Sequence, residues 1–230
     1  MRRLFPRAPR HSLGLVVQTD GLALAQASAA PQGQAHIQHW HWLTLPAVPQ
    51  TLQPLLVGWP DPAWVRLARQ RTGCQAQDTA LAIEDTRLRR LRLSLASGLN
   101  VREQVKAIEV ELSRQLPWAL ADTVWDFRCL PVAESASVAP PAQRPAWLEA
   151  AMQAQAVQQV EVLATQRAWV AACEHWCRAA GLWLVRLEPI WQAEDRWRRQ
   201  PRSVCAQDVH VLAPHLQAQV GGLALGVLTP

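Results

Sequence analysis

A change of hydrophobic periodicity between residues 78 and 130 constrains this fold more than any other feature of the sequence. Leu91, Leu93 and Leu95 alternate with polar residues, so the leucines occupy one face of a strand. Ser97 and Gly98 end that strand. The alternation returns between Val124 and Leu130, which predicts a second strand after an intervening segment of a different period.

The intervening segment predicts an amphipathic helix from Asn100 to Leu116. Asn100 stands at the N-cap position, and Glu103 follows at the spacing of a capping box. Pro117 stops the helix. The apolar residues recur every three or four positions along one face: Val101, Val105, Ile108, Leu112 and Leu116. Together with an apolar strand at Thr79–Ile83, the order is strand, strand, helix, strand.

The rest of the chain predicts further alternation of strands and helices. Residues 13–45 read as a three-stranded meander, and a helix is started or interrupted by the prolines at 60 and 62. Residues 158–188 read as strand, helix, strand, which predicts a parallel pair with a right-handed crossover. Residues 131–145 read as a mobile loop, residues 190–200 as a short charged helix and residues 208–227 as an apolar final helix.

Length and composition predict a cytoplasmic globular protein. Half of the 230 residues are hydrophobic, enough for one compact unit with two subdomains. The longest apolar runs are too short to cross a bilayer, and the basic start, residues 1–11, lacks the apolar stretch of a signal peptide. The five cysteines are an odd number without framework spacing, which favours a reducing compartment.

Two residue pairs have the spacing of partial metal sites. Cys173 and Cys177 are one helical turn apart, and His39 and His41 share a strand face. Neither pair has further ligands tied to it by the sequence, so we favour buried thiols and a structural strand. We expect no metal site. The serines and carboxylates form no catalytic constellation either, and we expect no enzymatic activity.

Arginine clusters raise the alternative of nucleic-acid binding. The net charge is +5, and Lys106 is the single lysine among the basic residues. Phosphate contacts need such charge, but alternating arginines are also what an exposed strand face contains. The clusters are Arg87, Arg89, Arg90 and Arg92, and Arg196, Arg198, Arg199 and Arg202.

An ordered series of short pieces in the central segment resembles the PilM family of type IV pilus assembly proteins, which are actin-like. The pieces are Ala82-Ile83, the A-S-G-L segment at 96–99, the helix from Asn100, the L-P-W-A-L turn at 116–120, and Asp126-Phe127. The segments at 37–46, 180–182, 212–216 and 222–225 resemble other parts of that family.

The resemblance implies a mixed α/β (α+β) fold, a truncated actin-like or ribonuclease H-like domain with an inserted small β-α-β subdomain. The main subdomain would comprise residues 11–78 and 156–230, and the inserted subdomain residues 79–131. Residues 132–146 would form a Pro/Ala/Ser-rich loop. The family's second half, with its second phosphate loop and adenosine pocket, has no counterpart between residue 200 and the final helix.

The same resemblance locates a degenerate phosphate loop in the first hairpin. Val16 stands where the family has an acidic residue, and Gln18 replaces a glycine that lets backbone amides approach a phosphate. Asp20 is close by but is typical of a hairpin turn. We therefore expect that ATP, the family's cofactor, is not bound, while a degenerate ATP-binding protein stays an alternative.

For function, the resemblance implies a non-enzymatic cytoplasmic adaptor of a type IV pilus or of a DNA-uptake (competence) machine. It would bind the cytoplasmic N-terminal peptide of a PilN-like inner-membrane protein, together with other pilus assembly proteins, and be peripheral to the membrane rather than inserted. Candidate partner-binding residues are Val101, Val105, Pro117 and Trp118. A cytoplasmic actin-like component of a type II secretion system, or an Arg-rich nucleic-acid-binding module, are the alternatives.

Overall fold

The computed structural model describes residues 11–18, 21–29, 35–44, 54–130, 157–199 and 214–228. The chain divides into two compact units, a larger one of residues 1–85 and 168–230 and a smaller one of residues 86–167. Among the described residues, no helix combines the length and the apolar character that crossing a bilayer requires. The Pro/Ala/Ser-rich loop predicted at residues 132–146 lies outside the described residues.

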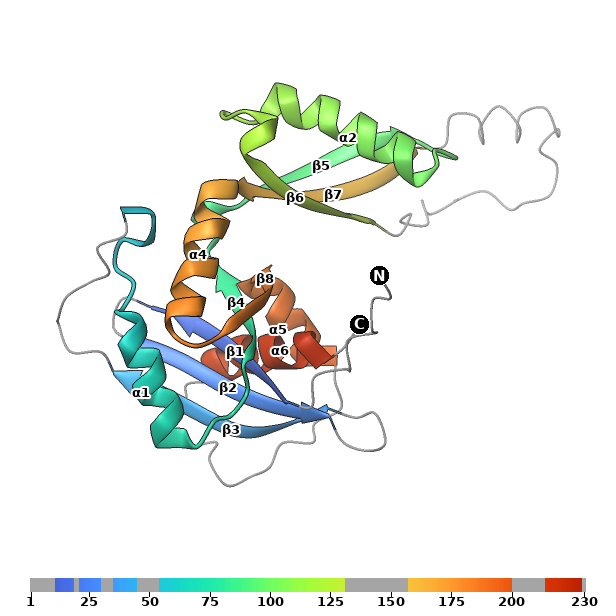
Figure 1. Cartoon of the computed structure of the whole chain (residues 1–230). Helices are drawn as coiled ribbons and strands as arrows, with labels where there is room; N and C mark the ends of the chain where they lie inside the picture. Colours follow the sequence, from blue (N-terminus) through green and yellow to red (C-terminus); the bar gives the residue numbers. More distant parts are fainter. Residues whose placement is uncertain are drawn as a thin grey trace, which may run out of the picture. The chain divides into compact units, whose positions relative to one another are not determined.

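The larger unit is built on a five-stranded sheet of order β3-β2-β1-β4-β8 (Figure 1). β1 (His11–Val17), β2 (Gly21–Ala29) and β3 (Ala35–Thr44) form an antiparallel meander, as predicted. β4 (Asp78–Ile83) and β8 (Trp183–Pro189) continue the sheet in parallel with β1. The crossover from the meander to β4 contains the 3₁₀ turn η1 (Pro54–Leu56) and α1 (Pro62–Thr72).

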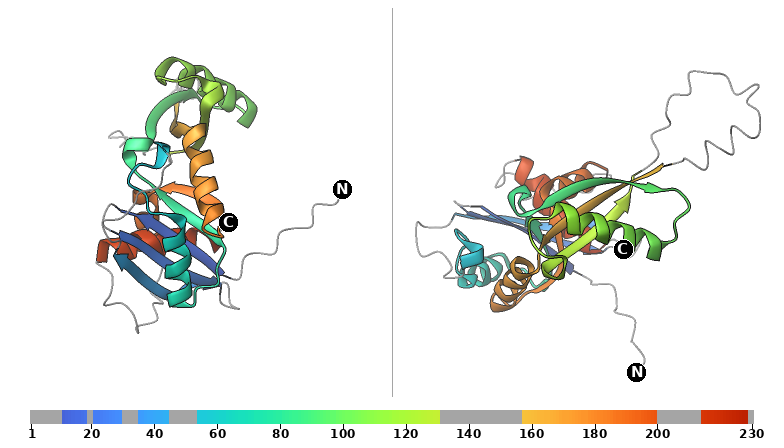
Figure 2. Two further views of the ribbon diagram at one scale, coloured as in Figure 1. Left: turned by 60° about the vertical axis from the view of Figure 1, so that its left-hand side comes forward. Right: turned by 90° about the horizontal axis from the view of Figure 1, so that it is seen from above.

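Helices cover both faces of this sheet (Figures 1 and 2). α6 (Pro214–Leu228) packs on the face that carries Val16, Ala23 and Ala80, with α5 (Ile190–Arg199) beside it. Gly14 permits this packing, because a Cβ there would meet the backbone of α6. α1 and α4 (Arg167–Ala179) lie on the opposite face.

Local signals place the ends of α1. Pro62 occupies the first turn, where its missing N–H costs nothing, and the Asp61 carboxylate accepts from the Ala63 amide at 2.7 Å. Gly73, with φ of 66°, is the left-handed C-cap, a conformation that glycine adopts without steric cost. Trp59 then packs edge-on against Trp176 of α4, with ring centroids 5.0 Å apart. These contacts anchor α4 to the segment that precedes α1.

The smaller unit is a three-stranded antiparallel sheet of order β5-β7-β6 with one helix along it. The strands are β5 (Arg89–Ala96), β6 (Thr123–Cys129) and β7 (Val157–Gln166), and the helix is α2 (Val101–Gln115). The turns η2 (Asp85–Arg87) and η3 (Leu120–Asp122) precede β5 and β6. The predicted capping box is confirmed, since Asn100 and Glu103 each accept the other's backbone N–H.

The core of the smaller unit lies between α2 and one face of its sheet. The leucines of β5 and the alternate residues of β7 meet the buried stripe of α2, and the residues involved are Leu93, Leu95, Ile108, Leu112, Leu116, Val160, Val162 and Ala164. Trp125 and Phe127 of β6 are partly buried against the same cluster. The mixed α/β fold with a small inserted unit is therefore confirmed.

Two strands lie elsewhere than predicted. β4 was assigned to the inserted subdomain but belongs to the larger unit, because it pairs in parallel with β1 and β8. β7 was assigned to the main subdomain but is the central strand of the smaller sheet. The prediction of a parallel pair across residues 158–188 was wrong, since β7 and β8 are in different sheets. The unit boundaries accordingly fall at residues 85 and 168, not at 79 and 131.

Candidate functional site

In the described part of the first hairpin, an apolar side chain stands at the position of the family's acidic residue. Val16 is 1% exposed and packs in the core between the sheet and α6. The Gln18 amide donates to the Gly21 carbonyl at 2.9 Å, which closes the hairpin. Asp20 lies outside the described residues. A valine side chain in the core can neither bind a magnesium-bound water nor accept a hydrogen bond, so Val16 does not fit a magnesium nucleotide.

The four predicted partner-binding residues do not form one cluster. Val101, at the start of α2, is 67% exposed, and Val105 is half-buried one turn later. Pro117 and Trp118 follow the other end of the helix, about 22 Å away at 1.5 Å per residue. Trp118 packs on the core of the smaller unit, and its indole N–H donates to the Thr123 hydroxyl at 3.1 Å. Its observed contacts are structural.

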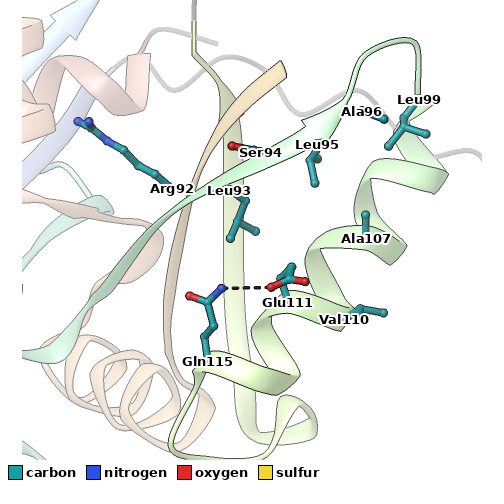
Figure 3. Close-up of a pocket in the computed structure, with 10 residues that line it drawn as sticks. All are labelled: Arg92, Leu93, Ser94, Leu95, Ala96, Leu99, Ala107, Val110, Glu111 and Gln115. Carbon is teal, nitrogen blue, oxygen red and sulfur yellow. Dashed lines mark hydrogen bonds between the residues drawn. The ribbon is translucent and has the colours of Figure 1, made fainter. Parts of the chain in front are cut away.

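A groove of about 580 Å³ lies in the smaller unit, between β5 and α2 (Figure 3). We call it the edge groove, because β5 is an end strand of the sheet and among the described residues pairs only with β7. The residues that line it come from β5, from the turn after it and from α2: Arg92, Leu93, Ser94, Leu95, Ala96, Leu99, Ala107, Val110, Glu111 and Gln115.

The side of the edge groove that faces α2 is apolar with one polar end. Leu93 and Leu95 are 6% and 5% exposed, whereas Val110 on the helix is 49% exposed. At the C-terminal end of α2, the Gln115 amide donates to the Glu111 carboxylate at 3.2 Å (Figure 3). Arg114 forms a further ion pair with Glu111 at 3.0 Å. The Glu111 charge is therefore neutralised within the helix.

The other face of the same sheet is polar and centred on one buried carboxylate. Glu161 of β7 is 1% exposed, and each of its oxygens accepts from a different guanidinium. Arg90 on β5 donates to Oε1 at 2.6 and 2.5 Å, and Arg128 on β6 donates to Oε2 at 2.7 and 2.6 Å. Such paired N–H donors are the strong form of ion pair, and they join all three strands.

Arg92 is the next basic residue on that polar face, and it differs from its neighbours. It is exposed, it pairs in register with Glu161, and it has no hydrogen bond or ion pair with another described residue. Its side chain points away from α2 while its backbone borders the edge groove (Figure 3). The edge groove therefore has an apolar flank on one side of β5 and, on the other, a cation that no described residue pairs with.

Two further groups, a cysteine thiol and a histidine ring, have pKa values shifted by their surroundings. Burial raises the pKa of the Cys177 thiol to about 12, with the nearby Glu174 adding to the effect, so that thiol is not a nucleophile. Burial and then Arg71 lower the pKa of His41. No group of three or more His, Cys, Asp or Glu residues suited to a metal ion occurs within these described segments.

One apolar residue of the edge groove lies outside the helix stripe that hydrophobic periodicity predicts. Val110 is an apolar residue on α2 that falls outside the stripe formed by Val101, Val105, Ile108 and the two leucines that follow. A single apolar residue off the buried stripe is common on helix surfaces, so this signal alone does not identify a contact surface. That the surface faces a free strand edge could only be seen from the sheet order.

Comparison with known proteins finds likeness at the level of structure alone. No family model matches the chain, and no curated protein matches it in sequence. A chain of a solved PilM-PilN type IV pilus biogenesis complex aligns over 80% of this chain with a TM-score of 0.60 and 20% identity. The cytoplasmic domain of EpsL, an inner-membrane component of the Vibrio cholerae type II secretion system, aligns over 84% with a TM-score of 0.47 and 13% identity.

The alignments cover only part of the two solved chains. This chain spans about half of the matched chain's length, 48%, and 60% of the EpsL domain. At 20% identity the likeness establishes the fold and not the activity. We conclude that the chain has a PilM-like fold, with the five-stranded sheet and the smaller unit as its two parts.

Proposed function

We propose that this protein is a non-enzymatic cytoplasmic adaptor of a type IV pilus or DNA-uptake machine. In this role it binds the cytoplasmic N-terminal peptide of a PilN-like inner-membrane protein and acts at the inner membrane without inserting into it. The observation that carries the proposal is the PilM-like fold, which extends over 80% of the chain in the comparison with a PilM-PilN complex.

The first hairpin supports the non-enzymatic, nucleotide-independent part of the proposal. Val16 is buried in the apolar core, so the position of the family's acidic residue provides no oxygen near the β1–β2 turn. Binding that depends on a protein partner rather than on a nucleotide needs no such oxygen. Peptides bind proteins of this size through backbone hydrogen bonds and a few apolar pockets, which strand edges and helix grooves supply.

The test is calorimetric titration of the full chain with a synthetic peptide that copies the cytoplasmic N-terminus of the PilN-like protein from the same source. We expect saturable micromolar binding that is unchanged by added magnesium-ATP. The same peptide in reversed sequence is the control for composition and charge. A folded protein that does not bind the peptide would refute the proposed partner, and binding that requires ATP would refute the nucleotide-independent mechanism.

Val101→Asp and Trp118→Phe address the candidate partner residues. Val101 is exposed, so a carboxylate there leaves the core intact and would weaken binding only if α2 contacts the peptide. Trp118→Phe removes the indole N–H and its bond to Thr123 but keeps most of the apolar packing. Circular dichroism of each variant separates loss of binding from loss of fold.

A further inference from the structure

The edge groove lies wholly within the smaller unit. Three of its features together indicate the chemistry of the ligand that would fit it. First, β5 pairs on one side only among the described residues, so alternate backbone N–H and C=O groups along its other side have no strand partner. An extended segment that joins β5 would satisfy these groups by adding a strand to the sheet.

Second, the flank toward α2 fits apolar side chains. Leu93 and Leu95 form a buried floor, and Leu99, Ala107 and Val110 complete the wall. Val110 is 49% exposed although it borders this apolar surface, so a side chain packed there would remove apolar area from water. In an added strand every second residue points to this flank.

Third, the opposite flank presents a positive charge that has no counter-ion within the part of the chain the structure describes. Arg90 and Arg128 are occupied by Glu161, whereas Arg92 has no ion pair with another described residue. The residues of an added strand that point away from α2 would therefore approach Arg92. Opposite charges on neighbouring strands stabilise the pairing, and like charges destabilise it.

We infer that the edge groove binds an extended segment of a partner protein in which apolar residues alternate with acidic residues. The segment adds to β5 as a fourth strand, with its apolar side chains against α2 and a carboxylate at Arg92. A second copy of this chain fits the surface poorly, because antiparallel pairing of two β5 strands centred on Arg92 sets one guanidinium opposite the other. This interaction is separate from the proposed binding of the PilN-like peptide and does not depend on it.

The probe is the peptide acetyl-Gly-Val-Asp-Val-Asp-Val-Asp-Gly-amide, compared with the peptide in which lysine replaces each aspartate. Amide resonances of the full chain are followed in two-dimensional NMR during titration to millimolar peptide. We expect shifts and slowed hydrogen exchange at the amides of β5 with the aspartate peptide. β6, the other end strand of the same sheet, is the internal control and should not change.

Two variants test the two flanks. Arg92→Glu should reverse the preference, so that the lysine peptide binds better than the aspartate peptide, with a change of about fivefold for each peptide as expected for an exposed ion pair. Val110→Asp should weaken binding of both peptides, because it places a charge on the apolar flank. Ser113→Asp adds the same charge at an exposed position of α2 outside the groove and should have no effect.

Three results would overturn the inference. One is absence of binding by either peptide to a folded protein, which would mean that the arginines of β5 serve only to keep other strands away from the edge. Another is equal binding of the two peptides. The third is binding without protection of the β5 amides, which would locate the ligand elsewhere.

Discussion

Replacing Glu161 with glutamine should destabilise the smaller unit more than any other conservative change of an acidic residue there. The side chain of Glu161 is 0% exposed, and its two oxygens accept four N–H donors from Arg90 and Arg128. Glutamine keeps the shape but replaces one oxygen with an NH₂ group, which would face the donors of a guanidinium. One arginine would then lose its acceptor altogether.

The expected loss of stability follows from how exposed the side chains of Glu161, Arg90 and Arg128 are. Breaking a fully buried ion pair costs about 3–5 kcal/mol, but the arginine side chains are 43% and 49% exposed and can turn toward water. We therefore expect a loss of about 3 kcal/mol in the free energy of unfolding, at the lower end of that range. Arg90→Gln and Arg128→Gln should each cost about 2 kcal/mol, because each leaves one oxygen of the buried Glu161 carboxylate without its guanidinium donor.

The assay is urea unfolding of the full chain, followed by the exchange of β7 amides so that the smaller unit is observed directly. Glu109→Gln is the matched control, since Glu109 is on α2 of the same unit and forms no hydrogen bond or ion pair with another described residue. We expect the control to change stability by less than about 0.5 kcal/mol. A loss below about 1 kcal/mol for Glu161→Gln would refute the reasoning, because the loss of an ordinary exposed ion pair has that cost.

Three further predictions concern single residues. Asn100→Ala removes the capping box of α2 and should cost about 1 kcal/mol in urea unfolding, whereas a change of under a few tenths would show that the cap is dispensable. Gly14→Ala places a Cβ against the Val220 carbonyl and should cost about 3 kcal/mol or more, since backbone must move; a variant with wild-type stability would contradict the close packing of α6 on β1. The raised pKa of Cys177, about 12 against an unfolded value near 9, means that the stability from its neutral form is complete below pH 9 and falls as pH rises toward 12. Alkylation by iodoacetamide, mapped by mass spectrometry, should therefore modify exposed Cys129 quickly and Cys177 only under unfolding or strongly alkaline conditions; equal rates at neutral pH would refute the burial.

The local structure of this chain could be predicted from short-range signals because the interactions that create it are themselves short-range. Asn100 and Glu103 define the start of α2, and Gly73 defines the end of α1, through bonds that span only a few residues. The alternating leucines of β5 likewise identify a strand and its buried face. The family resemblance added the PilM-like fold, which the structural likeness confirms.

The partners of the strands could not be predicted from the same signals. Thr79–Ile83 reads as a buried strand in any sheet, and only its pairing with β1 and β8 assigns it to the larger unit. Residues 158–164 looked like the first half of a crossover, yet β7 pairs with β5 and β6, far away in sequence. Hydrophobic alternation defines a face of a strand but carries no information about its neighbour.

The sequence by itself identified the capping box at the start of α2, the apolar faces of the strands and of α2, and the valine at position 16 where an acidic residue would stand. Tertiary structure alone decided that β5 is an end strand among the described strands and that Val110 borders a groove. It also decided that Arg90 and Arg128 share Glu161 while no described residue pairs with Arg92. The physical reason is that caps and periodicity are properties of neighbouring residues, whereas a free edge and an unpaired charge depend on which distant segments come together in space.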